Sequence, residues 1–368
     1  MLMKSAFAIS QRVLATSAAV LMSVAPAFGQ ASAPTPVQGY NLSVFATGVV
    51  GQFTAPDSIA VYKDHVYIGY GDGNDPTGAD GKTNMIVEYN RQGQKISSFT
   101  VKGHNDGLKL NPYTKKLWVM QNEDANPRLV IFDPETRQRE YVPFAQPPAG
   151  GGGYDDIAFR NGKAYLSASN PSNNSNNLPA IVEAKIQNGL VYVTPVLLGN
   201  ATATNVLNGQ TGALNLQDPD SMTTTPGGDL YLDSQGDSEV VIVRKPGTKQ
   251  QSVLLIPLSS PYGQAMADDS LFTPSADGFL LVADTPANIV YKITKAEFAP
   301  GVPYTAAVAG QSTAPGFVGR LDLDFGQLTP IVSGLKSPHG LGFVKTNDDD
   351  DSALDELKDK CQALSQNN

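Results

Sequence analysis

One short sequence pattern recurs six times along the chain and constrains the fold more than any other feature. In five copies an acidic residue precedes an apolar stretch, and in the sixth copy His takes the acidic position. The intervals between the aligned positions are 49, 49, 65, 48 and 71 residues. A repeat of about 48 residues with two longer insertions is typical of β-propeller blades. The aligned positions are Asp57, Asp106, Asp155, Asp220, Asp268 and His339.

The first four copies each begin a unit that reads as four strands. Turn signals such as Asn161-Gly162 separate the strands, because Asn and Gly tolerate the positive φ that tight hairpins need. No part of the repeat region shows sustained helical periodicity. The 35 Gly and 26 Pro residues suit a turn-rich sheet protein and argue against a helical bundle. We therefore predict an all-β fold, a β-propeller of four-stranded antiparallel blades.

The number of blades depends on the irregular last units. Six copies of the motif favour six blades, with five as the alternative. In the fifth unit, which begins at Asp268, residues 278–283 are predicted as the second strand, and residues 299–315 read as a long Gly/Pro-rich insertion. We expect the N-terminal strand at residues 40–48 to close the ring beside the C-terminal strands.

The N-terminal residues predict export. Residues 1–29 have the features of a secretory signal peptide, since Lys4 and Arg12 precede a run of apolar and small residues too short to span a bilayer comfortably. A retained membrane anchor is the alternative. We expect a bacterial periplasmic or secreted protein that has no membrane association after signal cleavage.

The rest of the chain divides into three parts by composition. Residues 30–39 are predicted as a linker and residues 40–345 as the propeller. Residues 346–368 form an acidic polar tail that is either disordered or a short helix. Cys361 in this tail is the only cysteine, so the chain has no intrachain disulfide.

The charge balance limits the partners. The chain carries 35 Asp and Glu against 26 Lys and Arg, a net charge of −9, and a nucleic-acid partner would need a basic surface instead. We expect a monomer that binds a small-molecule ligand or a protein partner.

Residues at one repeat position of a propeller surround its axis, so the motif predicts a ring of polar side chains. Crowded carboxylates repel one another, and a bound cation would relieve this. Ca²⁺ suits carboxylate and amide oxygens, whereas zinc is disfavoured because the chain has only 3 His residues. The alternative is that each Asp bonds to the backbone of its own turn and binds no ligand. His339 and His104 are candidates for proton transfer, or for bonds to the backbone alone.

Three stretches near the starts of innermost strands are Asn105-Asp106-Gly107, Pro219-Asp220-Ser221-Met222 and Ser337-Pro338-His339-Gly340-Leu341. They resemble motifs of the six-bladed senescence-marker-protein/gluconolactonase superfamily, and more loosely those of NHL-repeat and strictosidine-synthase-like propellers. That resemblance implies one divalent cation and lactone hydrolysis. By resemblance Asn105 and Asp220 match metal ligands, Asp57 stands where a Glu is usual, and Asp155 stands where an Asn is usual.

Two functions are open at this point. The first is a secreted, divalent-metal-dependent hydrolase of lactones or esters. Its metal ligands would be Asp57, Asn105, Asp155 and Asp220, with Asp220 as ligand or base and with His339 or His104 moving protons. The second is a non-catalytic, NHL-like propeller that binds a protein or a small ligand, since a propeller fold by itself does not specify activity.

Overall fold

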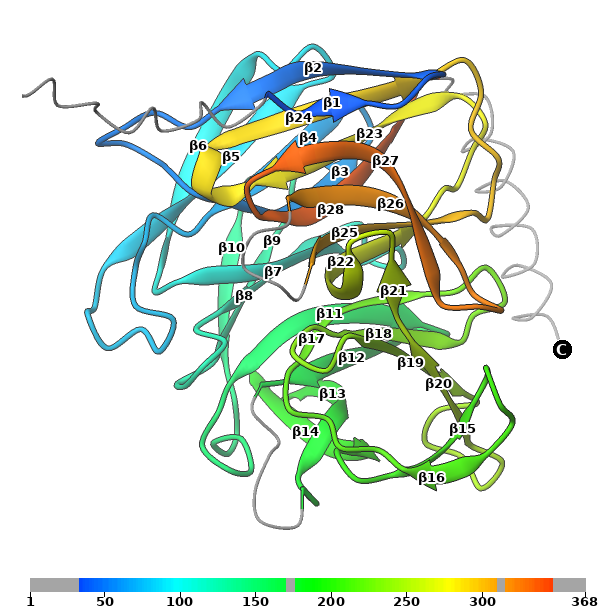
Figure 1. Ribbon diagram of the computed structural model, residues 1–368. Coiled ribbons are helices and arrows are strands. Elements are labelled where there is room, and N and C mark those ends of the chain that lie inside the picture. The colour runs from blue at the N-terminus through cyan, green and yellow to red at the C-terminus, as the bar shows by residue number, and fades with distance from the viewer. Residues whose placement is uncertain (1–32, 170–175, 310–314, 347–368) are drawn as a thin grey trace, which may run out of the picture. The chain divides into compact units, whose positions relative to one another are not determined.

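The chain forms a six-bladed β-propeller, as predicted (Figure 1). The computed structural model describes residues 33–169, 176–309 and 315–346. Each innermost strand contacts the next around the axis, and the last contacts the first, so the ring is closed. In order around the ring these strands are β3 (Pro56–Tyr62), β7 (Asn105–Leu110), β11 (Tyr154–Arg160), β17 (Pro219–Thr224), β22 (Gly263–Phe272) and β28 (Pro338–Lys345).

The first four blades follow the chain, and each strand pairs with the next one in sequence. Blade one adds β4 (His65–Tyr70), β5 (Thr83–Asn90) and β6 (Lys95–Lys102). Blade two adds β8 (Leu117–Gln121), β9 (Arg128–Phe132) and β10 (Arg139–Pro143). Blade three adds β12 (Lys163–Ala168), β13 (Pro179–Gln187) and β14 (Leu190–Leu198). Blade four adds β18 (Leu230–Ser234), β19 (Glu239–Arg244) and β20 (Ser252–Pro257), with β15 (Thr202–Asn205) and β16 (Thr211–Ala213) along its outer edge.

Local turn chemistry explains how these strands reverse. At the turn between β11 and β12, Asn161 has φ 49° and Gly162 has φ 75°. Two successive residues with positive φ make the tight turn whose twist matches that of the flanking strands. The Asn-Gly pair predicted this turn, and Asn188-Gly189 repeats it between β13 and β14 with φ values of 52° and 73°.

The last two blades exchange strands. Blade five contains β22, β25 (Pro303–Ala309), β26 (Gly316–Asp322) and β27 (Gln327–Leu335), flanked by the short strands β21 (Ser259–Ser260) and β1 (Thr35–Pro36). Blade six contains β28, β23 (Gly278–Asp284), β24 (Ile289–Lys295) and β2 (Tyr40–Thr47). A single turn of 3-10 helix, Thr285–Ala287, joins β23 to β24.

Two predictions about the fifth unit are therefore wrong. Residues 278–283 are not its second strand, because β23 pairs with β28 of blade six. Residues 299–315 are not only an insertion, because they contain β25, which is the second strand of blade five. The hairpin of β23 and β24 is local, so the sequence predicts it. The innermost strand that pairs with β23 is β28, which lies far along the chain. The small residues of β25, Ala306 and Ala307 among them, hide its strand character.

The ring closes within blade six. The N-terminal strand β2 is the outermost strand of this blade, and the C-terminal strand β28 is its innermost. The expectation that residues 40–48 close the ring is confirmed, but the strand beside β2 is β24 and not the C-terminal strand β28. Apolar side chains pack between the blades, as where Tyr70 and Val87 of blade one meet Phe279 and Leu281 of blade six, and their burial holds the innermost strands in place.

The predicted ends of the chain are only partly described. The predicted signal peptide, residues 1–29, lies outside the described residues, as does the tail beyond residue 346 with Cys361. Thr35–Pro36, within the predicted linker, pairs with β27. Within the ranges given above, no helix is long and apolar enough to cross a membrane.

Candidate functional site

The repeated sequence motif is a β-bulge. In every blade, two residues of the innermost strand stand opposite one residue of the neighbouring strand. Bulges of this kind re-aim side chains and are frequent next to active sites. The bulged pairs are Asp57 and Ser58, Asp106 and Gly107, Asp155 and Asp156, Asp220 and Ser221, Asp268 and Asp269, and His339 and Gly340.

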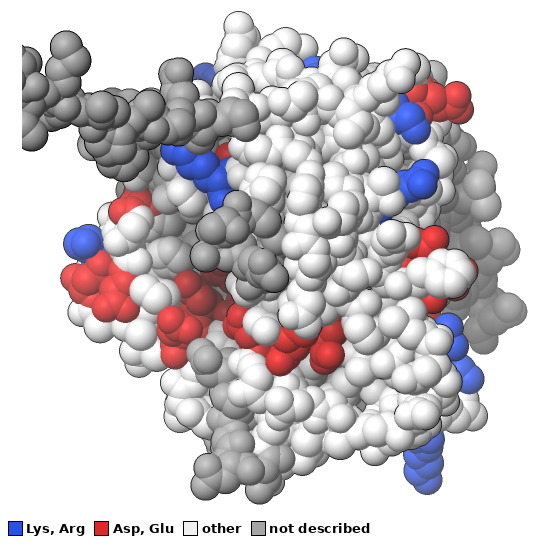
Figure 2. All heavy atoms as spheres, viewed as in Figure 1, with Lys and Arg blue, Asp and Glu red and all other residues white. Residues whose placement is uncertain are grey.

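The first residues of five of these pairs, all except Asp57, line a cavity at one end of the propeller axis, called here the axial cavity. Its volume is about 170 Å³. Acidic side chains gather in a band on the face shown in Figure 2. The lining consists of Asp106, Glu123, Asp124, Asp155, Ser169, Asp218, Asp220, Gln235, Asp268 and His339.

His339 lies between two carboxylates. Its Nδ1 is 3.0 Å from Asp268 Oδ2 and 3.3 Å from Asp57 Oδ1. Burial alone lowers the pKa of His339, but the charges and hydrogen bonds of Asp268 and Asp57 outweigh it and hold the pKa well above its ordinary value. Burial correspondingly raises the pKa of Asp57, and its hydrogen bond with His339 reverses this, so the net pKa is lowered. The two groups form an imidazolium–carboxylate pair.

Three other carboxyls in the axial cavity show the opposite behaviour. Burial raises the pKa of Asp106, Asp155 and Asp220 well above the ordinary range. Neighbouring carboxylates raise these pKa values further: Glu123 acts on both Asp106 and Asp155, and Asp268 acts on Asp220. The cavity thus combines three carboxyls whose pKa values are raised with an imidazole whose pKa is also raised.

Gln235 fixes two of these groups. Its Nε2 donates to Asp220 Oδ2 at 3.0 Å and to Asp268 Oδ2 at 2.6 Å. Because Asp268 also contacts His339, these bonds join Asp220 to the imidazole through two polar side chains. Gln235 follows β18 in a loop and carries no motif that would have identified it from sequence.

The structure places the predicted site residues in different surroundings. Asp155, Asp220 and His339 line the axial cavity, and Asp57 reaches it through His339. Asn105 does not line it: this residue precedes the bulge, is fully buried, and donates through Nδ2 to the carbonyl oxygen of Met120 at 3.1 Å. The bulge turns the next residue, Asp106, toward the axis instead.

His104 also lies behind the lining of the axial cavity. Its Nδ1 is 2.9 Å from Glu123 Oε2, and Glu123 is the residue that lines the cavity. Burial lowers the pKa of His104, but the hydrogen bond with Glu123 and its charge outweigh burial, so the net pKa is raised. His104 is therefore placed to orient Glu123 and to compensate its charge.

The predicted calcium site does not fit the residues as they lie. Within the described ranges, no three His, Cys, Asp or Glu side chains are positioned to hold a metal ion. Asn105 Oδ1, the atom that would bind a metal, accepts a hydrogen bond from Ser58 Oγ at 3.4 Å, and Asp57 is engaged by His339. We therefore derive no chemical step through a metal, and calcium binding stays a prediction.

The second residues of the bulged pairs form a layer beneath the first. They line a cavity of about 20 Å³, together with Lys109 and three of the Asp residues above it. Lys109 Nζ lies 2.9 Å from Asp156 Oδ2 and 3.4 Å from Asp269 Oδ1. Burial lowers the pKa of Lys109, but these two carboxylates outweigh it and raise the pKa above its ordinary value. The lower layer is thus a compensated charge network.

Fold and site together define a six-bladed β-propeller with an acidic, histidine-containing axial cavity. No protein-family model matches the chain, and no curated protein matches it either. Similar solved structures include the periplasmic gluconolactonase of Pseudomonas aeruginosa, with a TM-score of 0.46 and 13% identity over 84% of this chain and 99% of that one. A streptogramin B lyase structure matches with a TM-score of 0.45 and 14% identity over 82% and 90% of the two chains. At these values neither similarity bears on activity, and the gluconolactonase-like family stays a prediction.

Proposed function

We propose that the axial cavity binds a small-molecule ester or lactone and hydrolyses it by general acid–base catalysis. One observation carries the proposal: Asp220, a carboxyl with a raised pKa, and His339, an imidazole with a raised pKa, line the same cavity. Groups whose environments shift their pKa values in this way are typical of acid–base sites.

Asp220 is the proposed base. A carboxylate with a raised pKa accepts a proton more readily than an ordinary Asp, once it is ionised. It would take a proton from a water molecule while the water oxygen bonds to the carbonyl carbon of the substrate. The bond from Gln235 fixes the orientation of Asp220.

His339 is the proposed acid. Its imidazolium would stabilise the negative charge that develops on the carbonyl oxygen, and would then donate a proton to the alkoxide as the ester C–O bond breaks. Asp57 and Asp268 hold the ring in place and keep it protonated. In this scheme His104 acts only by orienting Glu123.

Hydrolysis of a panel of lactones and p-nitrophenyl esters tests this proposal. We expect Asp220→Asn and His339→Gln each to lower kcat/KM by about 10²–10⁴-fold, the usual contribution of one acid or base group. The matched controls lie outside the cavity: Asp229→Asn in the turn between β17 and β18, and His65→Gln at the start of β4. Both controls should retain wild-type activity. Absence of turnover across the panel, or full activity in both cavity variants, would refute the hydrolase.

The metal is tested separately. If the predicted calcium dependence holds, metal analysis of the purified protein finds one divalent cation per chain, and a chelator abolishes turnover until Ca²⁺ is restored. Turnover that a chelator does not change supports the metal-free scheme. Export is tested by fractionating cells that express the full chain.

The alternative is a non-catalytic propeller that binds a protein or a small ligand. It would show as saturable binding in calorimetry with no turnover of the bound compound. Full binding affinity in a protein that hydrolyses nothing would establish this alternative.

A further inference from the structure

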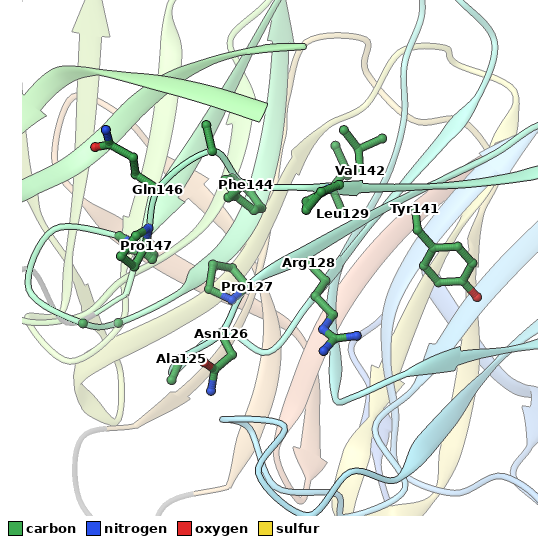
Figure 3. Close-up of a pocket in the computed structure, with 15 residues that line it drawn as sticks. Ala125, Asn126, Pro127, Arg128, Leu129, Tyr141, Val142, Phe144, Gln146 and Pro147 are labelled. Atoms are coloured by element: carbon green, nitrogen blue, oxygen red, sulfur yellow. The ribbon is translucent and has the colours of Figure 1, made fainter. Parts of the chain in front are cut away.

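An apolar groove of about 650 Å³ opens at the outer part of blade two. Side chains from the start of β9 and the end of β10 form its wall, with the loop that follows β10 (Figure 3). Leu129, Tyr141, Val142 and Phe144 supply its apolar surface, and Arg128 is the one charged residue in the lining. This volume lies in the range of small-molecule sites, which span about 300–1,000 Å³.

The groove adjoins the axial cavity because two chain segments line both. In the loop after β8, Glu123 and Asp124 line the cavity, and the residues from Ala125 onward line the groove. Gly152, in the loop before β11, lines the groove, and Asp155, near the start of β11, lines the cavity.

The two shared segments touch each other. A Cβ atom on Gly153 would collide with the carbonyl oxygens of Asn122 and Glu123. Only glycine therefore permits this approach, so the two segments that contribute to both linings pack directly against each other.

The two compartments differ in chemistry. The axial cavity has seven acidic side chains in its lining and one His. The groove is apolar, and its most exposed aromatic ring is that of Tyr141, with a relative exposure of 55%. Tyr141 lies on β10, the edge strand of blade two, where β9 is its only neighbour in the sheet. A ligand complementary to both compartments carries a positive charge at one end and an apolar body at the other.

We propose that the groove binds the aromatic or branched aliphatic body of a cationic ligand whose ammonium group lies in the axial cavity. The substrate class is then an amine-bearing ester or lactone with an apolar body. The ester or lactone bond in this description rests on the proposed hydrolysis, whereas the binding of the cation and the apolar body does not. The ammonium group offsets carboxylate repulsion in the cavity, and the apolar body covers Tyr141 and Phe144.

Calorimetry with three amides, which cannot be turned over as esters, tests the binding. Phenylalanine benzylamide has both features, its N-acetyl derivative lacks the cation, and glycinamide lacks the apolar body. We expect the first to bind at least about tenfold more tightly than either of the others, since tenfold corresponds to about 1.4 kcal/mol. Equal affinity of the N-acetyl derivative would overturn the proposal.

A variant pair locates the apolar body. We expect Tyr141→Ala to weaken phenylalanine benzylamide binding by about tenfold and to leave glycinamide binding unchanged. The control is Tyr113→Ala: Tyr113 has a relative exposure of 56% but lies in the turn between β7 and β8, outside the groove. Unchanged binding in Tyr141→Ala, or equal weakening in Tyr113→Ala, would overturn the placement.

Hydrolysis of phenylalanine benzyl ester separates this inference from the proposed function. Selective binding of the amide, with no hydrolysis of this ester or of any compound in the lactone and ester panel, supports the ligand site and refutes the hydrolase. Hydrolysis of simple lactones together with no preference among the three amides refutes the ligand site and leaves the hydrolase standing.

Discussion

The two layers of bulge residues at the propeller axis come from the same local structure and differ in charge compensation. The upper layer contains five Asp residues and His339. The lower layer contains only two Asp residues among Ser and Gly, and Lys109 bridges both of them. One repeated bulge therefore produces a structural network in one layer and a candidate site in the next.

The lower layer ties blades together. Asp156 of blade three accepts a hydrogen bond from the Met222 N–H of blade four at 2.9 Å. Asp269 of blade five likewise accepts from the Leu341 N–H of blade six at 2.8 Å. Lys109 comes from blade two, so its ion pair with Asp156 reaches the adjacent blade three and its ion pair with Asp269 reaches across the axis to blade five. In the upper layer burial raises the pKa values of Asp106, Asp155 and Asp220, and the charges of neighbouring carboxylates raise them further.

The largest expected effect comes from breaking the lower layer. Lys109→Met leaves Asp156 and Asp269 buried without a cation, and removing one partner of a buried ion pair costs about 3–5 kcal/mol. Denaturant unfolding at pH 8 should show this loss of stability. The control is Lys116→Met, whose ammonium lies 3.6 Å from Asp133 at the surface and whose loss should change stability by at most about 0.5 kcal/mol.

The pH used for that comparison matters. Burial raises the pKa of Asp269 to about 6 even with Lys109 present. In acid, protonation of Asp269 would therefore remove the buried charge that Lys109→Met leaves without a partner. We expect Lys109→Met to be less destabilised at pH 5 than at pH 8. Equal stability of variant and wild type at pH 8 would contradict a structural role for the network.

The next largest effect is the pH dependence of wild-type stability, which arises from the titratable groups of the upper layer. Asp106, Asp155, Asp220 and His339 all have raised pKa values, so the folded state holds more protons than the unfolded state above about pH 4. Stability from these groups is present in mild acid and is lost as pH rises through their folded pKa values. The pKa of Asp57 is lowered in the folded state. Its contribution to stability is therefore lost as the pH falls, and only in stronger acid.

Thermal unfolding at pH 5, 6, 7 and 8 with a chelator present measures this dependence. We expect the Tm to fall steadily over the series. A Tm that rises toward pH 8 would show that the pKa values of these groups are not raised in the folded state.

The smallest effect is expected from relieving that repulsion at one position. Asp220→Asn removes a charge and keeps an acceptor for Gln235, so it should stabilise the protein at pH 8 by about 1 kcal/mol, as substitutions of functional residues often do. The control Asp229→Asn removes a surface carboxylate 3.6 Å from Arg244 and should shift stability by less than about 0.5 kcal/mol. Destabilisation by Asp220→Asn would assign that residue to structure instead of function.

Sequence reasoning found the ring but not all of its members. Asp57, Asp155, Asp220 and His339 recur at one repeat position, and the structure brings them to the axis. The motif resemblance points to Asn105, whereas the bulge places Asp106 at the axial cavity. Gln235 and Asp218 line the axial cavity from the loops flanking blade four's strands, and no local pattern distinguishes such residues from ordinary loop polarity.

The all-β propeller fold and the polar residue that recurs in each innermost strand follow from the amino-acid sequence alone, which also favours six blades over five. These features are local, because period, turn chemistry and apolar alternation act within about 48 residues of chain. Only the tertiary structure decided that β23 and β24 join blade six, that Lys109 compensates Asp156 and Asp269, and that an apolar groove adjoins the axial cavity. Each of these depends on contacts between residues far apart in the chain, and the closed ring of blades is what brings them together.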